Sequence, residues 1–336
     1  MSEVPWIEAP TWNIATDDVR SGRLQPPPSE LATRFEELMV ALEREDVGPL
    51  KMSLADAINL RTKGRFRAES GAFASTLGTT WRRILLAGCA YDLAMKFMAC
   101  STMALGTPDG PVLARNMDFW PERELAIHSC TLRHSDTQGW KSDILGWPGS
   151  IGVVTGMSRN GFAIALNAVM SDERPPVDGY PVMLFLRKLI DDAMDFDEAV
   201  ERACRQRLRM DCLITKVGSE NDQKAVVDRT PKKHSVRRPR GDDPLVVTNG
   251  YRSLECQSLY RSEIEMTACG RYDRLIKLLR QSPNDVGLQD EALLYFLTDP
   301  GVLARITAQH TIMRPRQRTT RLYFPRRFLS QPPQFG

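Results

Sequence analysis

Cys100 is the residue whose setting in this sequence favours covalent chemistry. It follows a predicted helix and opens the run CSTMALG, which residues 107–110 (TPDG) separate from PVLARNMDF. Pro-Asp-Gly favours a tight turn, so we predict that the two runs form a β-hairpin. The hairpin would place Arg115 and Asp118 beside Cys100, where a guanidinium favours a thiolate and a carboxylate orients a base. The group could activate a nucleophile, but the residues alone favour a small core cysteine, as most cysteines at strand starts are.

Other catalytic patterns are missing from the sequence. It contains no GxxxxGK[ST], GxGxxG, HExxH or GxSxG motif and no CxxC pair. None of its four histidines has neighbours typical of a catalytic triad. His234 falls in the basic run PKKHSVRRPR, which we interpret as a solvated loop, and His310 falls in a predicted strand, where a buried structural role is favoured. We therefore expect neither a metal nor a cofactor.

The composition is that of a globular protein. Of the 336 residues, 42% are hydrophobic and 26% are charged, which suffices for a packed core. The formal net charge of +3 gives no support for binding to nucleic acid or to a membrane surface. No apolar run reaches the roughly 18 residues that a membrane-spanning helix requires.

The cysteines and the amino-terminal residues predict a reducing compartment. The seven cysteines are odd in number and irregularly spaced, which disfavours a disulfide framework. Residues 1–22 have neither the basic nor the apolar region of a secretory signal. We therefore expect a cytoplasmic location.

The elements that must position Cys100 change character along the chain. Residues 1–28 are expected to be irregular, Ser29 is predicted to cap a helix, and further helices are expected over 54–60 and 72–96. Hairpin strands and grouped helices follow Cys100, which favours antiparallel sheets covered by helices. The predicted strands are 100–106, 111–119, 150–157, 162–169, 211–217, 224–230, 244–249, 310–315 and 319–324. The predicted helices are 180–194, 197–206, with Asp195 or Asp197 as its cap, 268–281 and 290–298.

The run YDLAMKFMACSTMALGTPDGPVLARNMDF resembles the processing-site region of the acid ceramidase and N-acylethanolamine acid amidase family. That family belongs with the choloylglycine (bile salt) hydrolases and the penicillin acyltransferases among the N-terminal nucleophile hydrolases. The similarity continues in order over most of residues 81–314, and the Cys…Arg-Asn-x-Asp run is its specific part. The further similar pieces are WPGSIGVVTGMSRNGFAIALNAV, GYPVMLFLRKLIDDAMDFDEAVERA, VVTNGY, CGRYDR and HTIM.

The resemblance implies the fold and the domain organisation. It implies an α+β fold in which residues 100–336 form a four-layer αββα sandwich, preceded by a helical pro-segment over residues 1–99. It also implies self-cleavage of the Ala99–Cys100 bond, which would make Cys100 the first residue of the mature chain. The pro-segment would remain bound as a small subunit or leave. The sequence leaves open whether copies of the chain form a homo-oligomer.

The resemblance also assigns roles to site residues. Arg115 and Asp118 match the family's substrate- and amine-positioning pair, and Asn249 in VVTNGY matches its oxyanion asparagine. Arg271 in CGRYDR matches an arginine near the nucleophile, and Asn167 in IALNAV matches an asparagine of the bile salt hydrolase branch. From the residues alone, Arg115 and Asp118 could form an ordinary ion pair and Asn249 could mark a turn. Arg271 could lie on a solvated helix face, and Asn167 could bond to backbone at a strand end.

The implied activity is hydrolysis of a linear carbon–nitrogen bond in a small N-acyl amide, fatty-acyl, ceramide-like or bile-salt-like, through a Cys100 acyl-thioester. Cleavage would free an α-amine whose reference pKa of about 7.7–8.0 suits a general base, so no histidine is needed. One alternative is an acyltransferase that passes the acyl group to an amine, and another is an uncleaved, non-catalytic family member. Six apolar residues could line an acyl pocket, although most are expected to be core: Trp147, Met157, Phe162, Met170, Met183 and Phe185.

Overall fold

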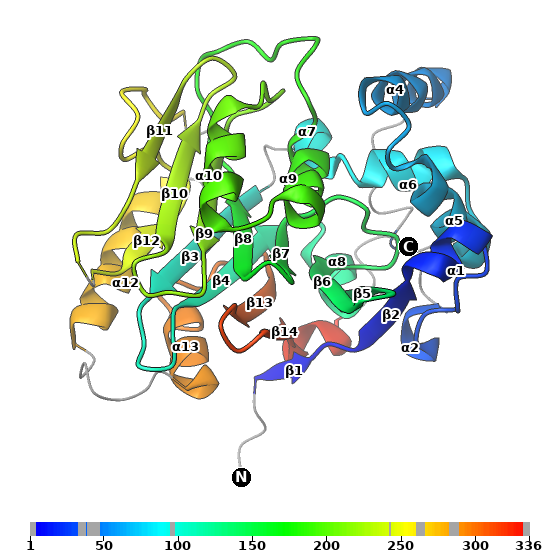
Figure 1. Cartoon of the computed structure of the whole chain (residues 1–336). Helices are drawn as coiled ribbons and strands as arrows, with labels where there is room; N and C mark the ends of the chain where they lie inside the picture. Colours follow the sequence, from blue (N-terminus) through cyan, green and yellow to red (C-terminus); the bar gives the residue numbers. More distant parts are fainter. Residues whose placement is uncertain are drawn as a thin grey trace.

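Two β-sheets lie face to face at the centre of the molecule (Figure 1). The computed structural model describes residues 5–32, 38, 48–94, 98–241, 243–259, 266–281 and 289–331. Strands β3 and β4 of the first sheet contact β8 and β9 of the second, so the inner faces of the sheets pack against each other. The larger hydrophobic core fills this space and continues beneath the helices on the second sheet.

Sheet A has six strands in the order β1-β14-β13-β4-β3-β12, and neighbouring strands pair antiparallel. Its β3–β4 hairpin confirms the hairpin prediction, and its register sets Cys100 opposite Met117 and Ala99 opposite Asp118. At the turn, the Thr107 hydroxyl donates to the Gly110 carbonyl at 2.6 Å. The strands are β1 (Trp6–Glu8), β3 (Met98–Leu105), β4 (Val112–Phe119), β12 (Leu245–Val247), β13 (Thr307–Arg314) and β14 (Thr319–Pro325).

Sheet B has eight strands in the order β11-β10-β9-β8-β7-β6-β5-β2. Strand β2 pairs with β5 in parallel, and the other neighbours pair antiparallel. The predicted Asn-Gly turn joins β7 to β8, with Gly161 at φ 76°. The strands are β2 (Thr11–Ala15), β5 (Cys130–Asp136), β6 (Gly139–Gly146), β7 (Thr155–Ser158), β8 (Phe162–Asn167), β9 (Cys212–Val217), β10 (Lys224–Arg229) and β11 (His234–Arg237).

Helices form the two outer layers. Helices α9 (Val182–Asp192) and α10 (Phe196–Arg205) pack on sheet B, and α12 (Ala268–Gln281) and α13 (Asp290–Leu297) pack on sheet A (Figure 1). The side chain of Asp195 caps α10 by accepting from the Glu198 amide at 2.8 Å, as predicted. A second core lies between sheet A and its helices. The four layers confirm the predicted αββα sandwich.

The amino-terminal segment corrects one expectation. The described part of residues 1–28 is not irregular throughout, because β1 adds an edge strand to sheet A and β2 adds one to sheet B. Trp12 and Ile14 are buried while their neighbours in β2 are not, so the strand follows the two-residue period of a half-buried edge. The amino-terminal segment therefore contributes a strand to each sheet.

The single helix expected over 72–96 is also wrong. Gly78, at φ 68°, ends one helix, and a second break follows at Gly88, where an added Cβ would lie 2.6 Å from Ile151. The predicted helix over 54–60 lies within α4. Of the helix expected from Ser29, the continuation through Phe35, Met39 and Leu42 falls outside the described residues. The helices before β3 are α1 (Thr16–Ser21), α2 (Ser29–Ala32), α4 (Gly48–Arg61), α5 (Arg67–Leu77), α6 (Trp81–Ala87) and α7 (Ala90–Ala94).

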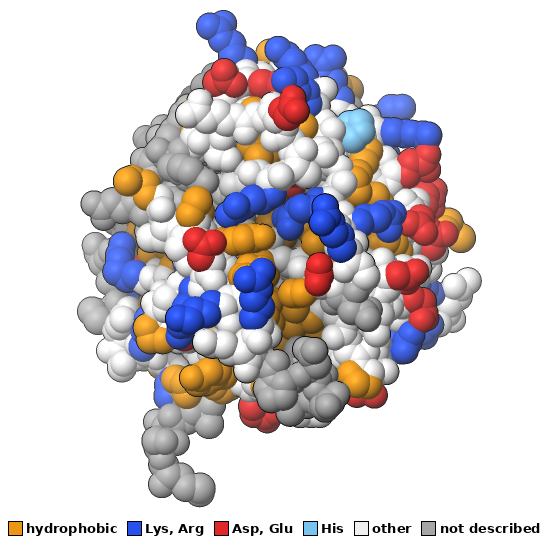
Figure 2. All heavy atoms as spheres, turned by 90° about the vertical axis from the view of Figure 1, so that its left-hand side faces the viewer, with side chains coloured by type: hydrophobic (Ala, Val, Ile, Leu, Met, Phe, Trp, Pro, Cys, Tyr) orange, Lys and Arg blue, Asp and Glu red, His pale blue; other side chains and the backbone are white. Residues whose placement is uncertain are grey.

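The remaining short elements were not predicted. They are α8 (Glu122–Ile127), β5, β6, β11 and the 3-10 helix η2 (Arg326–Leu329). Strand β11 corrects the interpretation of the basic run as a solvated loop, because its side chains alternate between exposed and half-buried and Arg237 donates to the Val246 carbonyl at 3.3 Å. Arg238, just beyond the strand, pairs with Asp197 at 3.1 Å. Figure 2 shows acidic side chains beside the Lys and Arg side chains on this side of the molecule. Among the described residues, no helix combines the length and apolar character needed to cross a membrane.

Candidate functional site

Cys100 lies on β3 with its side chain between the two sheets, and it is fully buried. Its sulfur accepts a hydrogen bond from Arg115 Nη2 at 2.7 Å. The Arg115 guanidinium is buried as well and also donates to sheet B, to the Val154 carbonyl at 3.0 Å and to the Thr155 hydroxyl at 2.9 Å. Arg115 therefore spans the space between the sheets and holds a positive charge against the thiol.

Asn249 occupies the position opposite Cys100 beyond the end of β12. The register pairs Val247 with Thr102, so two further residues set position 249 against position 100. There the Asn249 side chain takes over from the backbone: its Oδ1 accepts the Cys100 amide at 3.2 Å, and its Nδ2 donates to the Ala168 carbonyl at 2.8 Å. Asn249 therefore contacts the nitrogen that cleavage would release.

Arg271 reaches the same backbone from α12. Its Nη1 donates to the Cys100 carbonyl at 2.8 Å and to the Ser101 hydroxyl at 2.7 Å, and its Nη2 donates to Asn249 Oδ1 at 2.8 Å. The buried residues of α12 are Ala268, Arg271, Leu275 and Leu278, which form one face at helical spacing. Arg271 thus lies on the packed face of the helix, and the alternative of a solvated cation is wrong.

Asp118 lies on β4 opposite Ala99 and is fully buried. Its Oδ1 accepts the Thr307 hydroxyl at 2.6 Å, and its Oδ2 lies 3.7 Å from Arg271 Nη1. No described residue donates a hydrogen bond to Oδ2. Because positions 115 and 118 point to opposite faces of a strand, Arg115 faces sheet B while Asp118 faces α12. The two residues therefore lie on opposite faces of sheet A: Arg115 contacts the Cys100 sulfur, and Asp118 lies opposite Ala99.

Asn167 connects the sheets rather than contacting Cys100. Its Oδ1 accepts the Thr102 hydroxyl at 2.7 Å, and its Nδ2 donates to the carbonyls of Val247 at 3.2 Å and Thr248 at 3.1 Å. It therefore fixes β3 and the end of β12 relative to β8. This arrangement matches the alternative of backbone bonding at a strand end and positions Asn249 indirectly.

Burial dominates the electrostatics of the site. Burial raises the pKa of the Cys100 thiol, Arg115 lowers it and Asp118 raises it. Burial also raises the pKa of Asp118, while Arg271 and the Thr307 hydrogen bond lower it. The thiol is therefore protonated at neutral pH in the uncleaved chain, and any attack by its sulfur has to begin with removal of that proton.

Several site residues were not identified from the sequence. Three hydroxyl groups bind the predicted site residues: that of Thr307 binds Asp118, that of Thr155 binds Arg115, and that of Ser101 binds Arg271. No local pattern marks these hydroxyl residues, because their partners are distant in sequence. The residues considered for an acyl pocket lie in the core or pack against it. Among the described residues, no group of His, Cys, Asp or Glu side chains is placed to hold a metal ion.

The prediction of a buried structural role for His310 is confirmed. His310 is buried in β13 and its Nδ1 lies 2.7 Å from Asn116 Oδ1, and burial lowers its pKa to about 3. It is neutral at physiological pH. This supports the structural role expected for it.

The comparisons with known proteins identify the family. Residues 105–300 match the family described as acyl-coenzyme A:6-aminopenicillanic acid acyl-transferase. This range includes Arg115, Asp118, Asn249 and Arg271 and begins just after Cys100. No curated protein sequence matches the chain.

One solved structure shares the fold, and two others show a weaker similarity. The N-acylethanolamine-hydrolyzing acid amidase ortholog of Caenorhabditis elegans has 18% identity and a TM-score of 0.54, over 65% of this chain and 93% of that one. Penicillin V acylase from Agrobacterium tumefaciens has 12% identity and a TM-score of 0.43, over 66% and 82%. A mutant of the conjugated bile acid hydrolase from Clostridium perfringens has 14% identity and a TM-score of 0.40, over 68% and 89%. Because the family match covers more than half of the sequence, the chain belongs to the acyl-coenzyme A:6-aminopenicillanic acid acyl-transferase family, among the N-terminal nucleophile hydrolases.

Proposed function

We propose that the chain cleaves its own Ala99–Cys100 bond and that Cys100 then hydrolyses a linear carbon–nitrogen bond of an N-acyl amide. One observation carries the proposal: the nitrogen, the carbonyl oxygen and the sulfur of Cys100 each have a buried polar partner, respectively Asn249, Arg271 and Arg115. Any buried residue needs partners for its backbone N–H and C=O, but the sulfur of a core cysteine packs as a small apolar group and needs no guanidinium beside it.

Self-cleavage begins with attack of the Cys100 sulfur on the Ala99 carbonyl carbon. The carbon–sulfur bond forms, the Ala99–Cys100 amide bond breaks, and the thiol proton ends on the released nitrogen. Water then hydrolyses the thioester and leaves a carboxylate on Ala99 and a free thiol on Cys100. Asp118 lies opposite Ala99, and its Oδ2 accepts no hydrogen bond from the described residues. This supports a role for Asp118 in holding the new α-amine.

Amide hydrolysis uses that amine as the base. The amine accepts the thiol proton, the thiolate beside Arg115 attacks the substrate carbonyl, and the proton passes to the leaving amine. Water hydrolyses the resulting acyl-thioester and frees the acid. Asn249 Nδ2 donates one N–H to Ala168 and carries a second, which supports its role as donor to the oxyanion.

The substrate class is an N-acyl amide with an apolar acyl chain. Ala99 and Cys100 are both fully buried in the uncleaved chain, so the residues before the bond have to move before a substrate reaches the sulfur. The apolar residues around 145–185 belong to the core in this closed arrangement.

Residues 1–99 are proposed to stay bound after cleavage as a small subunit. Strand β1 pairs with β14 and β2 pairs with β5, so the segment would keep a strand in each sheet. In addition, Glu69 of α5 accepts two hydrogen bonds from Arg187 of α9, both at 3.0 Å. The seven cysteines are free thiols, in support of the proposed cytoplasmic location.

Acyl transfer to an amine is the second candidate, because the matching family is described as an acyl-transferase. Both reactions pass through the same thioester and differ in the acceptor.

One experiment tests both candidates. Purified protein is mixed with an N-acyl amide carrying an apolar acyl chain, quenched in acid and analysed by mass spectrometry.

We expect the mass of the chain that begins with Cys100 to increase by that of the acyl group, and we expect free acid to be released. Addition of a primary amine that diverts most of the acyl group into a new amide would favour the transferase. Product release without any acylated chain, or equal release by Cys100→Ala, would contradict both.

A further inference from the structure

The first turn of α9 is capped by a residue from the other side of the proposed cleavage bond. Pro181 precedes the helix and has no side-chain acceptor, while the Val182 amide donates to the Asp92 carboxylate, at 3.1 Å to Oδ1 and 2.9 Å to Oδ2. First-turn amides have no partner within their own helix, and a carboxylate also interacts favourably with the positive end of the helix dipole. Asp92 belongs to α7, so α7 supplies the cap that α9 lacks.

The same short helix is held by two further contacts. Tyr91 is fully buried, its amide donates to Met183 Sδ at 3.4 Å, and its hydroxyl donates to the Asp211 carbonyl. Gly88 lies just before α7, and its carbonyl oxygen would be only 2.3 Å from a Cβ added at Gly152. The backbones at Gly88 and Gly152 are therefore in close contact. The chain entering the cleavage region is therefore docked on α9 and on the loop before β7.

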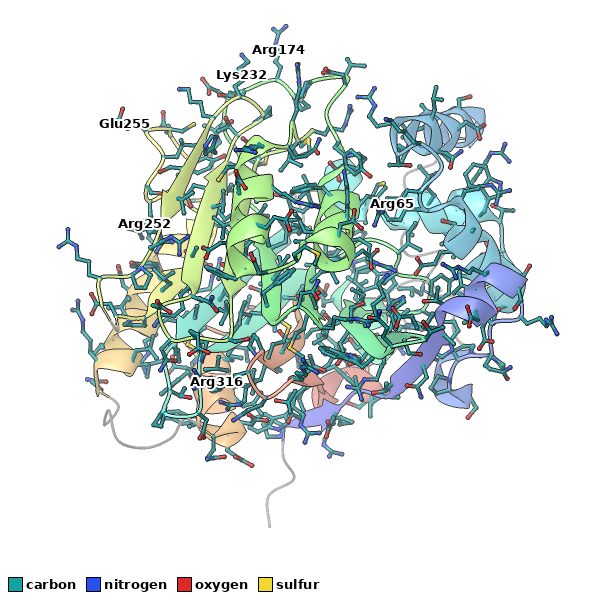
Figure 3. The ribbon with its side chains drawn as sticks, viewed as in Figure 1. Arg65, Arg174, Lys232, Arg252, Glu255 and Arg316 are labelled. Atoms are coloured by element: carbon teal, nitrogen blue, oxygen red, sulfur yellow. The ribbon has the colours of Figure 1, made fainter. Side chains whose placement is uncertain are left out.

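The other end of α9 is also held by the amino-terminal segment. Arg65 donates to both carboxylate oxygens of Asp192, at 2.9 and 2.6 Å, and Figure 3 labels it beside α9. Arg65 is far in sequence from the cleavage bond, whereas Asp92 precedes Ala99 by seven residues. The two contacts join the same pair of segments and differ in their distance along the chain from Ala99.

We propose that Asp92 is a positioning residue for self-cleavage. By capping α9 it anchors the chain ahead of Ala99 and, together with the pairing of Ala99 with Asp118, limits the positions that the Ala99 carbonyl can take relative to the Cys100 sulfur. Attack requires the reacting atoms to lie within about 3–3.5 Å, and misplacement by about 1 Å can cost on the order of 100-fold in rate. The inference rests on the proposed self-cleavage and adds a residue that touches neither reacting group.

The test follows cleavage of the full chain after a pulse of cell-free translation. Loss of a cap corresponds to a roughly 5- to 30-fold change in the docking equilibrium, so Asp92→Ala is expected to slow cleavage by about that factor. Asp92→Asn keeps an acceptor for the Val182 amide and is expected to cleave within about twofold of wild type. Arg65→Ala is the matched control and is expected to cleave at the wild-type rate.

A second variant separates anchoring from the folding of α9. Adding Pro181→Ser to Asp92→Ala gives α9 a cap of its own but does not restore the anchor, so cleavage is expected to stay slow even where the fold recovers. Wild-type cleavage rates in Asp92→Ala or in the double variant would overturn the inference, as would equal slowing by Arg65→Ala. A wild-type chain that never cleaves would instead overturn the proposed function itself.

Discussion

The side chain of Asn249 makes the hydrogen bond to the Cys100 amide that the backbone of a longer β12 would make. Strand β12 ends at Val247, yet the register continues to Asn249, whose Oδ1 accepts the Cys100 amide at 3.2 Å. Arg271 completes this edge by donating to the Cys100 carbonyl and to Asn249 Oδ1, each at 2.8 Å. Because both contacts lie on the Cys100 side of the bond, they persist after Ala99 is released. The nucleophile would thus keep its position when its amine becomes free.

Replacement of Asn249 should impair chemistry more than folding. Asn249→Ala removes the partner of the Cys100 nitrogen and the proposed oxyanion donor, so we expect self-cleavage to slow by about 10²–10³-fold. The measurement is the fraction cleaved against time. Asn160→Ala is the control, because Asn160 also precedes a glycine, and its Nδ2 donates to the Ala193 carbonyl at 2.7 Å, away from the site. Equal slowing in both variants would contradict the assigned role.

Thr307→Val should make stability more sensitive to pH. Burial raises the pKa of Asp118 and the Thr307 hydroxyl lowers it, so the variant should raise that pKa further. A raised pKa gives stability at low pH that is lost as pH rises through the folded-state value. We therefore expect the variant to lose about 1–3 kcal/mol at pH 8 and less at pH 4. Urea unfolding at both pH values measures the difference, and equal losses would show that Asp118 is not involved. Thr307→Ser should restore the wild-type behaviour.

Two ion pairs across the proposed cleavage boundary should differ in their effect on subunit retention. Glu69 and Arg187 are largely buried, with side chains 14% and 4% exposed, whereas Glu8 and Arg321 are 52% and 53% exposed. Glu69→Gln should cost about 1–3 kcal/mol, because it weakens two buried hydrogen bonds of Arg187 while Asp191, 3.1 Å from Arg187 Nε, still supplies a counter-charge. Glu8→Gln should cost less than about 1 kcal/mol.

The readout for these pairs is the urea concentration at which the cleaved segments separate on a sizing column. A lower concentration is expected for Glu69→Gln than for wild type. Separation of the Glu8→Gln segments at the same low concentration would contradict the account.

Asp92 should make the folded chain less stable as pH rises. Burial raises its pKa to about 7, against the hydrogen bond from Val182 and the charge of Arg209. Cys89, Tyr91 and Cys212 also face it and are protonated at this pH, because burial raises their pKa values. The folded chain therefore keeps a proton that the unfolded chain has lost, and this stability disappears as pH rises through about 7.

Asp92→Asn cannot ionise, so its stability relative to wild type should grow between pH 4 and pH 8, by up to about 4 kcal/mol. Urea unfolding across this range measures the difference. A constant difference would show that Asp92 titrates alike in both states.

Local patterns explain what could be predicted from the sequence. Pro-Asp-Gly and Asn-Gly turns mark their hairpins, Asp195 marks the start of α10, and both follow from backbone preferences of a few residues. The family motif then placed Arg115, Asn249 and Arg271 around Cys100, although spacing alone could not have joined residues so far apart.

Long-range partners explain what could not be predicted. Strand β1 is only three residues long and exists because β14 pairs with it. Thr307 and Asp92 each gain their role from one partner distant in sequence, and no local period encodes such a pair. Asn167 was assigned near the chemistry, but Thr102 and the end of β12 occupy its side chain.

Intact-mass analysis of the purified protein tests the central claim most directly. The account predicts two chains, one ending at Ala99 and one starting at Cys100, whose masses sum to that of the intact chain plus one water. Cys100→Ala should give a single intact chain without amidase activity. An active wild-type protein that remains one uncleaved chain, or a Cys100→Ala variant that still splits at this bond, would contradict it.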